Sequence, residues 1–209
     1  MKGTTHVFIG GVVGSYIGFL EQDPLIAGVS IAAASLSALA PDLDTNSTFT
    51  NRITLNPERI HRILALVGIL LIIAAFWPAQ PYETWLLVTI GAALVIFPKK
   101  AISRKTLLLC TAFLIGGTGI YLDMQPALLT LSLFLILAAF SSHRGFTHSL
   151  FGLALWSYMC YEASLVLNMQ VLLTAGAAGY ASHLLTDTKL FLNKRGIKPL
   201  WIFLPKLEI

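Results

Sequence analysis

The sequence predicts an all-α protein, a polytopic bundle of about eight transmembrane helices with both termini in the cytoplasm. Composition is the first reason, since hydrophobic residues make up 56% of the 209 residues and charged residues only 11%. An ordinary soluble domain has about 25% charged residues. The mean hydropathy is +0.77, and the apolar residues lack the period-2 alternation of strands. This composition excludes a soluble globular enzyme, a disordered protein and a nucleic-acid binder with a broad basic surface.

The second reason is a series of eight apolar runs, each about 16–19 residues long. A helix needs roughly 17–25 residues to cross a bilayer. Turn-forming residues such as Asp23-Pro24 and Gln125-Pro126 separate the runs, and six or seven spans remain alternative counts. In the first run, glycine recurs at every fourth position from Gly10 to Gly18, which predicts a smooth face for close helix packing. The runs are 5–20, 24–40, 63–78, 83–98, 106–122, 126–142, 149–167 and 171–187.

The third reason is the distribution of positive charge. If eight helices alternate across a membrane, the segments on the side of the N-terminus contain all 14 Lys and Arg residues. The opposite side has none, although it has acidic residues such as Glu21 and Glu162. Short cytoplasmic loops carry an excess of Lys and Arg, so we expect both termini and these segments in the cytoplasm. They are residues 1–4, 41–62, 99–105, 143–148 and 188–209.

Histidines and aspartates gather at four helix ends on that same side. His183 and Asp187 are four residues apart, so they share one helix face. Ionisable residues at membrane depth are costly and indicate function, and imidazole with carboxylate predicts a metal site. His61 is left out, because Glu58, Arg59, His61 and Arg62 are typical of a solvated turn beside the membrane. The candidate ligands are His6, Asp42, Asp44, His143, His148, His183 and Asp187.

Four motifs carry a resemblance to a known family. They are Thr5-His6, Pro41-Asp42-Leu43-Asp44, His143-Arg144-Gly145-Phe146-Thr147-His148-Ser149 and Gly179-Tyr180-Ala181-Ser182-His183-Leu184-Leu185-Thr186-Asp187. In order and spacing they resemble the YdjM-like family of bacterial inner-membrane proteins, and the resemblance implies a metal-dependent hydrolase. Many members have a histidine after the second aspartate, where this chain has Thr45.

The resemblance covers the two ends of the chain. We therefore expect one integral-membrane domain over residues 1–209, with a metal-site core formed by residues 1–47 and 141–205. Residues 62–140, which contain four of the apolar runs, look like an insertion between these two parts.

The ligand set predicts a divalent transition metal. Imidazole with carboxylate suits zinc, manganese or iron, and zinc is our first choice. Seven candidates exceed the four ligands of one tetrahedral zinc, so one or two ions are expected. Arg144 could clamp an anionic oxygen through its planar guanidinium, or could be a membrane anchor. We assign catalytic roles to Arg144 and Asp44.

We expect hydrolysis of a phosphoester or lipid-type substrate at the cytoplasmic face of the bacterial inner membrane, with membrane lipids as partners and without nucleic acid. Two other classes stay open. A metal-ion transporter would hold its ions near the bilayer midplane, whereas these candidates lie at the rim. A non-enzymatic membrane protein could use the metal as a structural element.

Overall fold

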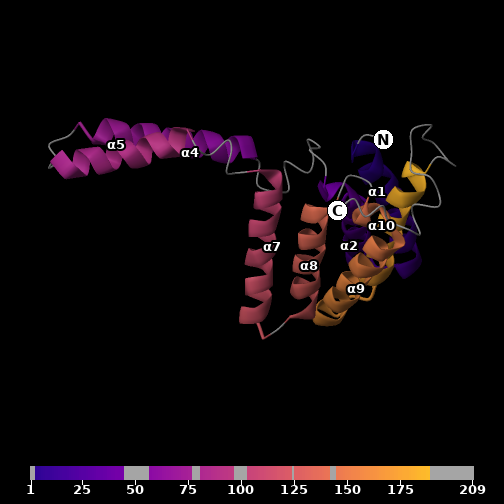
Figure 1. Cartoon of the computed structure of the whole chain (residues 1–209). Coiled ribbons are helices and arrows are strands. Elements are labelled where there is room, and N and C mark those ends of the chain that lie inside the picture. Colours follow the sequence, from indigo (N-terminus) through magenta and orange to yellow (C-terminus); the bar gives the residue numbers. More distant parts are fainter. Residues whose placement is uncertain are drawn as a thin grey trace. The chain divides into compact units, whose positions relative to one another are not determined.

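The chain folds into eight α-helices and two short 3₁₀ segments over the residues that the computed structural model describes, which are 3–44, 57–76, 81–96, 103–123, 125–141 and 145–188. These ranges contain no β-strand, so the all-α prediction is confirmed for them. The elements are α1 (Gly3–Glu21), α2 (Pro24–Ser37), η1 (Ala40–Asp44), α4 (Pro57–Ala74), α5 (Pro81–Ile96), α7 (Arg104–Tyr121), α8 (Pro126–Phe140), η2 (Phe146–His148), α9 (Leu150–Leu167) and α10 (Val171–Asp187) (Figure 1).

Each predicted apolar run corresponds to one of these helices, and local sequence explains where the helices begin. The helices α2, α4, α5 and α8 all begin with a proline, whose fixed φ and missing N–H suit the first helical position. Asp23 caps α2, since its carboxylate accepts a hydrogen bond from the backbone N–H of Leu25 at 2.8 Å. At the other end of a helix, Asn168 has a left-handed conformation, with φ of 52°, and ends α9.

Two helix boundaries differ from the sequence prediction. Helix α2 ends at Ser37, and the chain then turns into η1, because Pro41 cannot donate a hydrogen bond and disfavours helical geometry in the residue before it. Helix α4 begins at Pro57. Arg59, His61 and Arg62 therefore belong to the first turns of a helix, so the prediction of a turn there was wrong, although Arg59 and Arg62 are exposed.

Only two helices in the described ranges are both long and apolar enough to cross a membrane by length and composition. They are α1 and α9, with 19 and 18 residues. Four further apolar segments are shorter than 18 residues, namely Pro24–Ser37, Thr84–Ile96, Lys105–Tyr121 and Pro126–Phe140. Eight membrane spans therefore stay a prediction.

The chain divides into two compact units, residues 1–50 with 108–209 and residues 51–107. In the first unit, α1, α2 and α10 pack against one another, α10 also packs on α9, and α9 packs on α8 (Figure 1). Helix α8 and most of α7 belong to this unit, although both lie in the predicted insertion. In the second unit, α4 packs against α5.

Small residues allow α1 and α10 to approach α2 closely. A Cβ atom at Gly14 of α1 would lie 2.6 Å from the carbonyl oxygen of Ser30, and one at Gly179 of α10 would overlap the backbone of Ala34. The glycine face predicted on the first apolar run therefore does pack against a neighbouring helix. This packing also determines where the polar helix ends meet.

Candidate metal site

Four segments that are far apart in the sequence meet in the first unit. They are the start of α1, which carries His6, the η1 segment with Asp42, the η2 segment with His148, and the end of α10 with His183 and Asp187. Their side chains form two groups that could hold a metal ion, His6–Asp42–His183 and His148–His183–Asp187. Within each group the potential ligand atoms lie within 4.8 Å of one another, and the groups share His183. The two groups thus form one continuous cluster.

On α1 and α10, the helix face that carries the buried glycines also carries ligands of this cluster. His6 precedes Gly10 by four residues on α1, and both are buried on the same face. On α10, Gly179, His183 and Asp187 are also four residues apart and buried. In each helix, glycine permits close contact of the backbones, so the histidine one turn away from it is brought against the neighbouring helix.

The η2 segment is held by hydrogen bonds on both sides of His148. The hydroxyl of Tyr180 donates a hydrogen bond to the carbonyl oxygen of Thr147, and the hydroxyl of Ser149 donates one to the carbonyl oxygen of Phe146 at 2.6 Å. Ser149 also caps α9, since its hydroxyl accepts from the N–H of Gly152 at 3.3 Å. These contacts fix the position from which the ring of His148 reaches the cluster.

Tyr180 is a positioning residue that the sequence analysis did not identify. It is fully buried and packs with Phe134 and Leu184 in the apolar core next to the cluster. Its place within the fourth motif, three residues before His183, was the available signal. A buried tyrosine usually has a partner for its hydroxyl, but the sequence does not indicate which carbonyl group that is.

The distances between ligand atoms fit a shared metal ion. The Nε2 atoms of His148 and His183 are 3.3 Å apart, and two nitrogens bound at about 2.0–2.1 Å to one tetrahedral zinc lie about 3.3–3.4 Å apart. Asp42 Oδ1 lies 3.7 Å from Nε2 of His148 and 3.8 Å from Nε2 of His183. Asp187 Oδ2 lies 3.8 Å and 3.9 Å from the same two nitrogens. These distances are too long for direct hydrogen bonds and suit groups that surround a cation.

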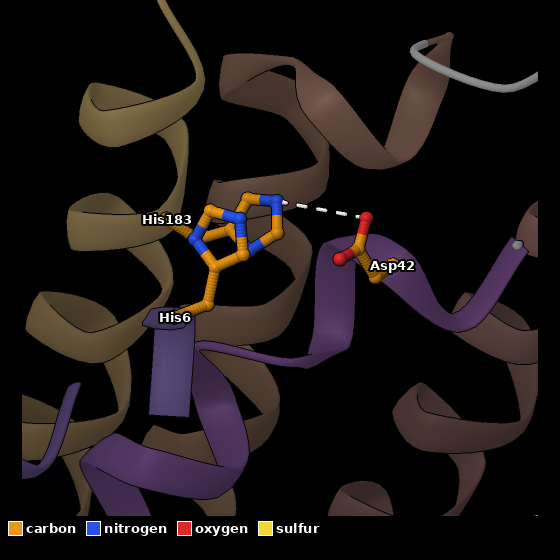
Figure 2. Close-up of side chains that lie close together, drawn as sticks. All are labelled: His6, Asp42 and His183. Carbon is orange, nitrogen blue, oxygen red and sulfur yellow. Dashed lines mark ion pairs between the residues drawn. The ribbon is translucent and has the colours of Figure 1, made fainter. Parts of the chain in front are cut away.

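His6 completes the cluster from α1. Its ring stacks on that of His183 with centroids 3.9 Å apart, and Asp42 faces the two rings from η1 (Figure 2). The Nε2 atom of His6 lies 3.5 Å from Asp187 Oδ1. This nitrogen is buried and has no hydrogen-bond partner among the residues that the structure describes. Because burial of an unsatisfied polar atom is costly, this nitrogen indicates a ligand beyond those that the described residues supply.

The Nδ1 atoms of the three histidines contact other groups and so leave the Nε2 atoms for the cluster. His183 Nδ1 lies 2.7 Å from the carbonyl oxygen of Ala38. A carbonyl oxygen can only accept, so Nδ1 carries the proton and Nε2 of a neutral ring presents a lone pair. His6 Nδ1 contacts Thr186, and His148 Nδ1 contacts Thr147. Metal-binding histidines almost always have such partners on the second ring nitrogen, so this donor set fits a metal ion.

The cluster is almost closed to solvent. His148 and His183 are fully buried, and His6 and Asp187 are 1% and 4% exposed. The side chain of Asp42 is 14% exposed and is therefore the most accessible of the five. Charged and polar groups at this depth need compensation, which a divalent cation among two carboxylates and three imidazoles would provide.

The structure thus brings together five of the seven predicted ligands. The side chain of Asp44 lies outside the described residues, as do His143 and Arg144, so their predicted roles are not tested. His61, which the sequence analysis left out, lies on α4 in the second unit.

Comparison with known proteins identifies the family. No curated protein and no solved structure matches the chain. The model of the family described as YdjM inner membrane protein matches residues 1–97 and 84–206. The two matched segments contain all seven predicted ligands and also the residues of the predicted insertion. This chain belongs to the YdjM inner membrane protein family.

Proposed function

We propose that this protein is a polytopic inner-membrane hydrolase that depends on a divalent transition metal bound by the His/Asp cluster. One observation carries the proposal: three histidines and two aspartates from four separate segments turn their ligand atoms toward one buried volume. Hydrophobic packing alone would not gather these groups, because each is costly to bury. A mixed imidazole and carboxylate set suits zinc, manganese or iron, and zinc is the ion we propose.

The described ligands favour one principal ion. The two groups overlap at His183, and Nε2 of His183 is within 3.3–3.9 Å of His148, Asp42 and Asp187. A second ion would require further ligands, for which the sequence offers Asp44 and His143. A bound divalent metal would supply a Lewis acid that polarises a substrate oxygen and increases the acidity of water.

The residues of the chain have separate tasks in this proposal. The three buried histidines, Asp187 and Asp42 are proposed to hold the ion, and Asp42, the most exposed of the five, is proposed to be the ligand nearest to the arriving substrate and water. Arg144 follows directly after His143 in the sequence and is proposed to bind the anionic oxygen of the substrate. Asp44, two residues after Asp42, is proposed to hold or move a proton near the attacking water.

Large apolar side chains support a location within the membrane. Phe8 is 71% exposed and lies two residues after His6, and Leu185 is 55% exposed between His183 and Asp187. Phe151, three residues after His148, is 60% exposed. Exposed apolar surface of this extent is typical of contact with a bilayer. Together with the sorting of Lys and Arg, it supports a multi-pass arrangement with the cluster near the cytoplasmic face.

The same apolar side chains favour a lipid as the substrate. Each lies within three residues of a cluster ligand along the chain, so we infer that the boundary of the hydrocarbon layer lies close to the ligands. The ester bonds of a phospholipid lie at that boundary. A phosphorylated lipid would therefore present its reactive phosphorus at the depth of the metal, whereas a water-soluble phosphoester would have to leave the aqueous phase.

The test is a hydrolysis assay of the purified full-length protein in detergent. Phosphorylated lipids in mixed micelles are compared with water-soluble phosphomonoesters and phosphodiesters. We expect lipid hydrolysis that stops after chelation, returns with zinc and is lost in His148→Ala but retained in the control His61→Ala. Metal binding without hydrolysis of any substrate in the panel would overturn the enzyme proposal in favour of a structural metal. Metal flux into proteoliposomes would overturn it in favour of a transporter.

A further inference from the structure

One hydroxyl group connects two of the histidines in the cluster. The side chain of Thr186, in the last turn of α10, lies with Oγ1 3.1 Å from Nδ1 of His6. The same oxygen donates a hydrogen bond to the backbone carbonyl of His183 at 3.0 Å. Thr186 thus bridges the start of α1 and the end of α10, and 180 residues separate it from His6 along the chain.

The chemistry of this bridge determines where the proton of His6 lies. A hydroxyl group has one proton, and the carbonyl oxygen of His183 can only accept it. Both contacts of Thr186 can therefore be hydrogen bonds only if its oxygen accepts from Nδ1–H of His6. A neutral imidazole carries one proton, so Nε2 is left with a lone pair. This is the same buried nitrogen that lacks a hydrogen-bond partner within the described residues.

We propose that Thr186 is a positioning residue that keeps His6 in the Nδ1-protonated form and so makes its Nε2 atom available to the metal. The proposal rests on the proposed metal-dependent function. It assigns Thr186 a role for His6 that matches the role of the Ala38 carbonyl for His183. Without the hydroxyl, His6 could place its proton on Nε2, toward Asp187 Oδ1 at 3.5 Å, and this would remove one ligand.

Two substitutions at Thr186 distinguish the effect of the hydroxyl group from the effect of the side-chain shape. Thr186→Val keeps the branched shape but cannot accept a hydrogen bond, whereas Thr186→Ser keeps the hydroxyl. Loss of such an outer partner typically lowers metal affinity by about 10–100-fold. We expect this loss in Thr186→Val and near wild-type affinity in Thr186→Ser. The matched control is Thr174→Val, because Thr174 lies on the same helix and bonds only to a carbonyl of its own helix in the described structure, that of Val171.

The measurement is zinc affinity by competition with a chromophoric chelator, together with the visible spectrum of the cobalt-loaded full-length protein. In a His6→Ala background, we expect Thr186→Val to cause no further loss, because Thr186 acts through His6. Wild-type affinity in Thr186→Val, equal losses in the valine and serine variants, or an undiminished effect without His6 would each overturn the proposal. If the wild-type protein binds no metal, the proposed function fails as well, and this outcome is distinct from a failure of Thr186 alone.

Discussion

The Nε2 atoms of His148 and His183 lie 3.3 Å apart, although 35 residues separate the two histidines in the sequence. His148 reaches this point from a short 3₁₀ segment that the hydroxyl of Tyr180 holds in place, and His183 reaches it from the end of α10. Two imidazole lone pairs at this distance repel each other unless a proton or a metal ion lies between them. The packing of η2 and α10 therefore determines the distance between two proposed metal ligands.

The close contact of α2 and α10 should be essential for metal binding. An alanine Cβ atom at position 179 would overlap the backbone of Ala34, so Gly179→Ala should force the two helices apart. Overpacking of this kind costs about 1–3 kcal/mol. It should also displace His183, which lies one turn after Gly179 on α10. We expect a lower thermal unfolding temperature and weaker zinc binding in detergent-solubilised protein.

The control for that experiment is Gly28→Ala on α2, since no neighbouring segment of the described structure lies within 4 Å of the Cβ atom it would add. Alanine is favoured over glycine in a helix by about 0.5–1 kcal/mol, so this variant should be as stable as the wild type or slightly more stable. If Gly179→Ala behaves like Gly28→Ala in both assays, the packing of α10 on α2 does not position the ligands.

Arg144 should affect turnover more than metal binding. If its guanidinium stabilises charge that develops on the substrate, Arg144→Ala should keep the metal but lose about 10²–10³-fold in rate, as for other oxyanion contacts. Arg144→Lys retains the positive charge without the planar fork, so it should restore membrane orientation but not full turnover. The measurements are metal content, steady-state kinetics and reporter orientation. Wild-type turnover in both variants would show that Arg144 is a membrane anchor.

The sorting of Lys and Arg predicts the topology of the chain. With both termini in the cytoplasm and eight spans, reporter fusions after Ile209 and within residues 79–82 should report opposite sides of the membrane. A fusion after Ile209 should show cytoplasmic reporter activity. A periplasmic signal at that position would contradict the cytoplasmic C-terminus and, with it, the placement of the metal cluster near the cytoplasmic face.

Much of the fold could be predicted from the sequence because its signals are local. Apolar runs separated by turn residues predicted the eight helices, and proline accounts for the early end of α2 and the early start of α4. For α4, the charged residues Arg59 and Arg62 obscured a helix that begins at Pro57. Charge is a poor guide to helix boundaries, since Arg and Glu are good helix formers.

The candidate site could be predicted only in part. Helices that alternate in direction across a membrane place every second connection on the same side. The polar residues at four helix ends on that side were therefore expected to meet. The partners that orient the ligands could not be predicted in this way. The contacts of Tyr180 with Thr147, of the Ala38 carbonyl with His183 and of Thr186 with His6 depend on side-chain geometry between distant segments.

Elemental analysis of the purified protein tests the central claim most directly. The wild-type protein and the control His61→Ala should contain a stoichiometric transition metal, with zinc as the expected element. Removal of one ligand in His148→Ala or Asp187→Ala should abolish or strongly reduce the metal content, while monodispersity in detergent is retained. Full metal occupancy in both variants, or a wild-type protein without metal after purification and zinc loading, would contradict the assignment of the His/Asp cluster as a metal site.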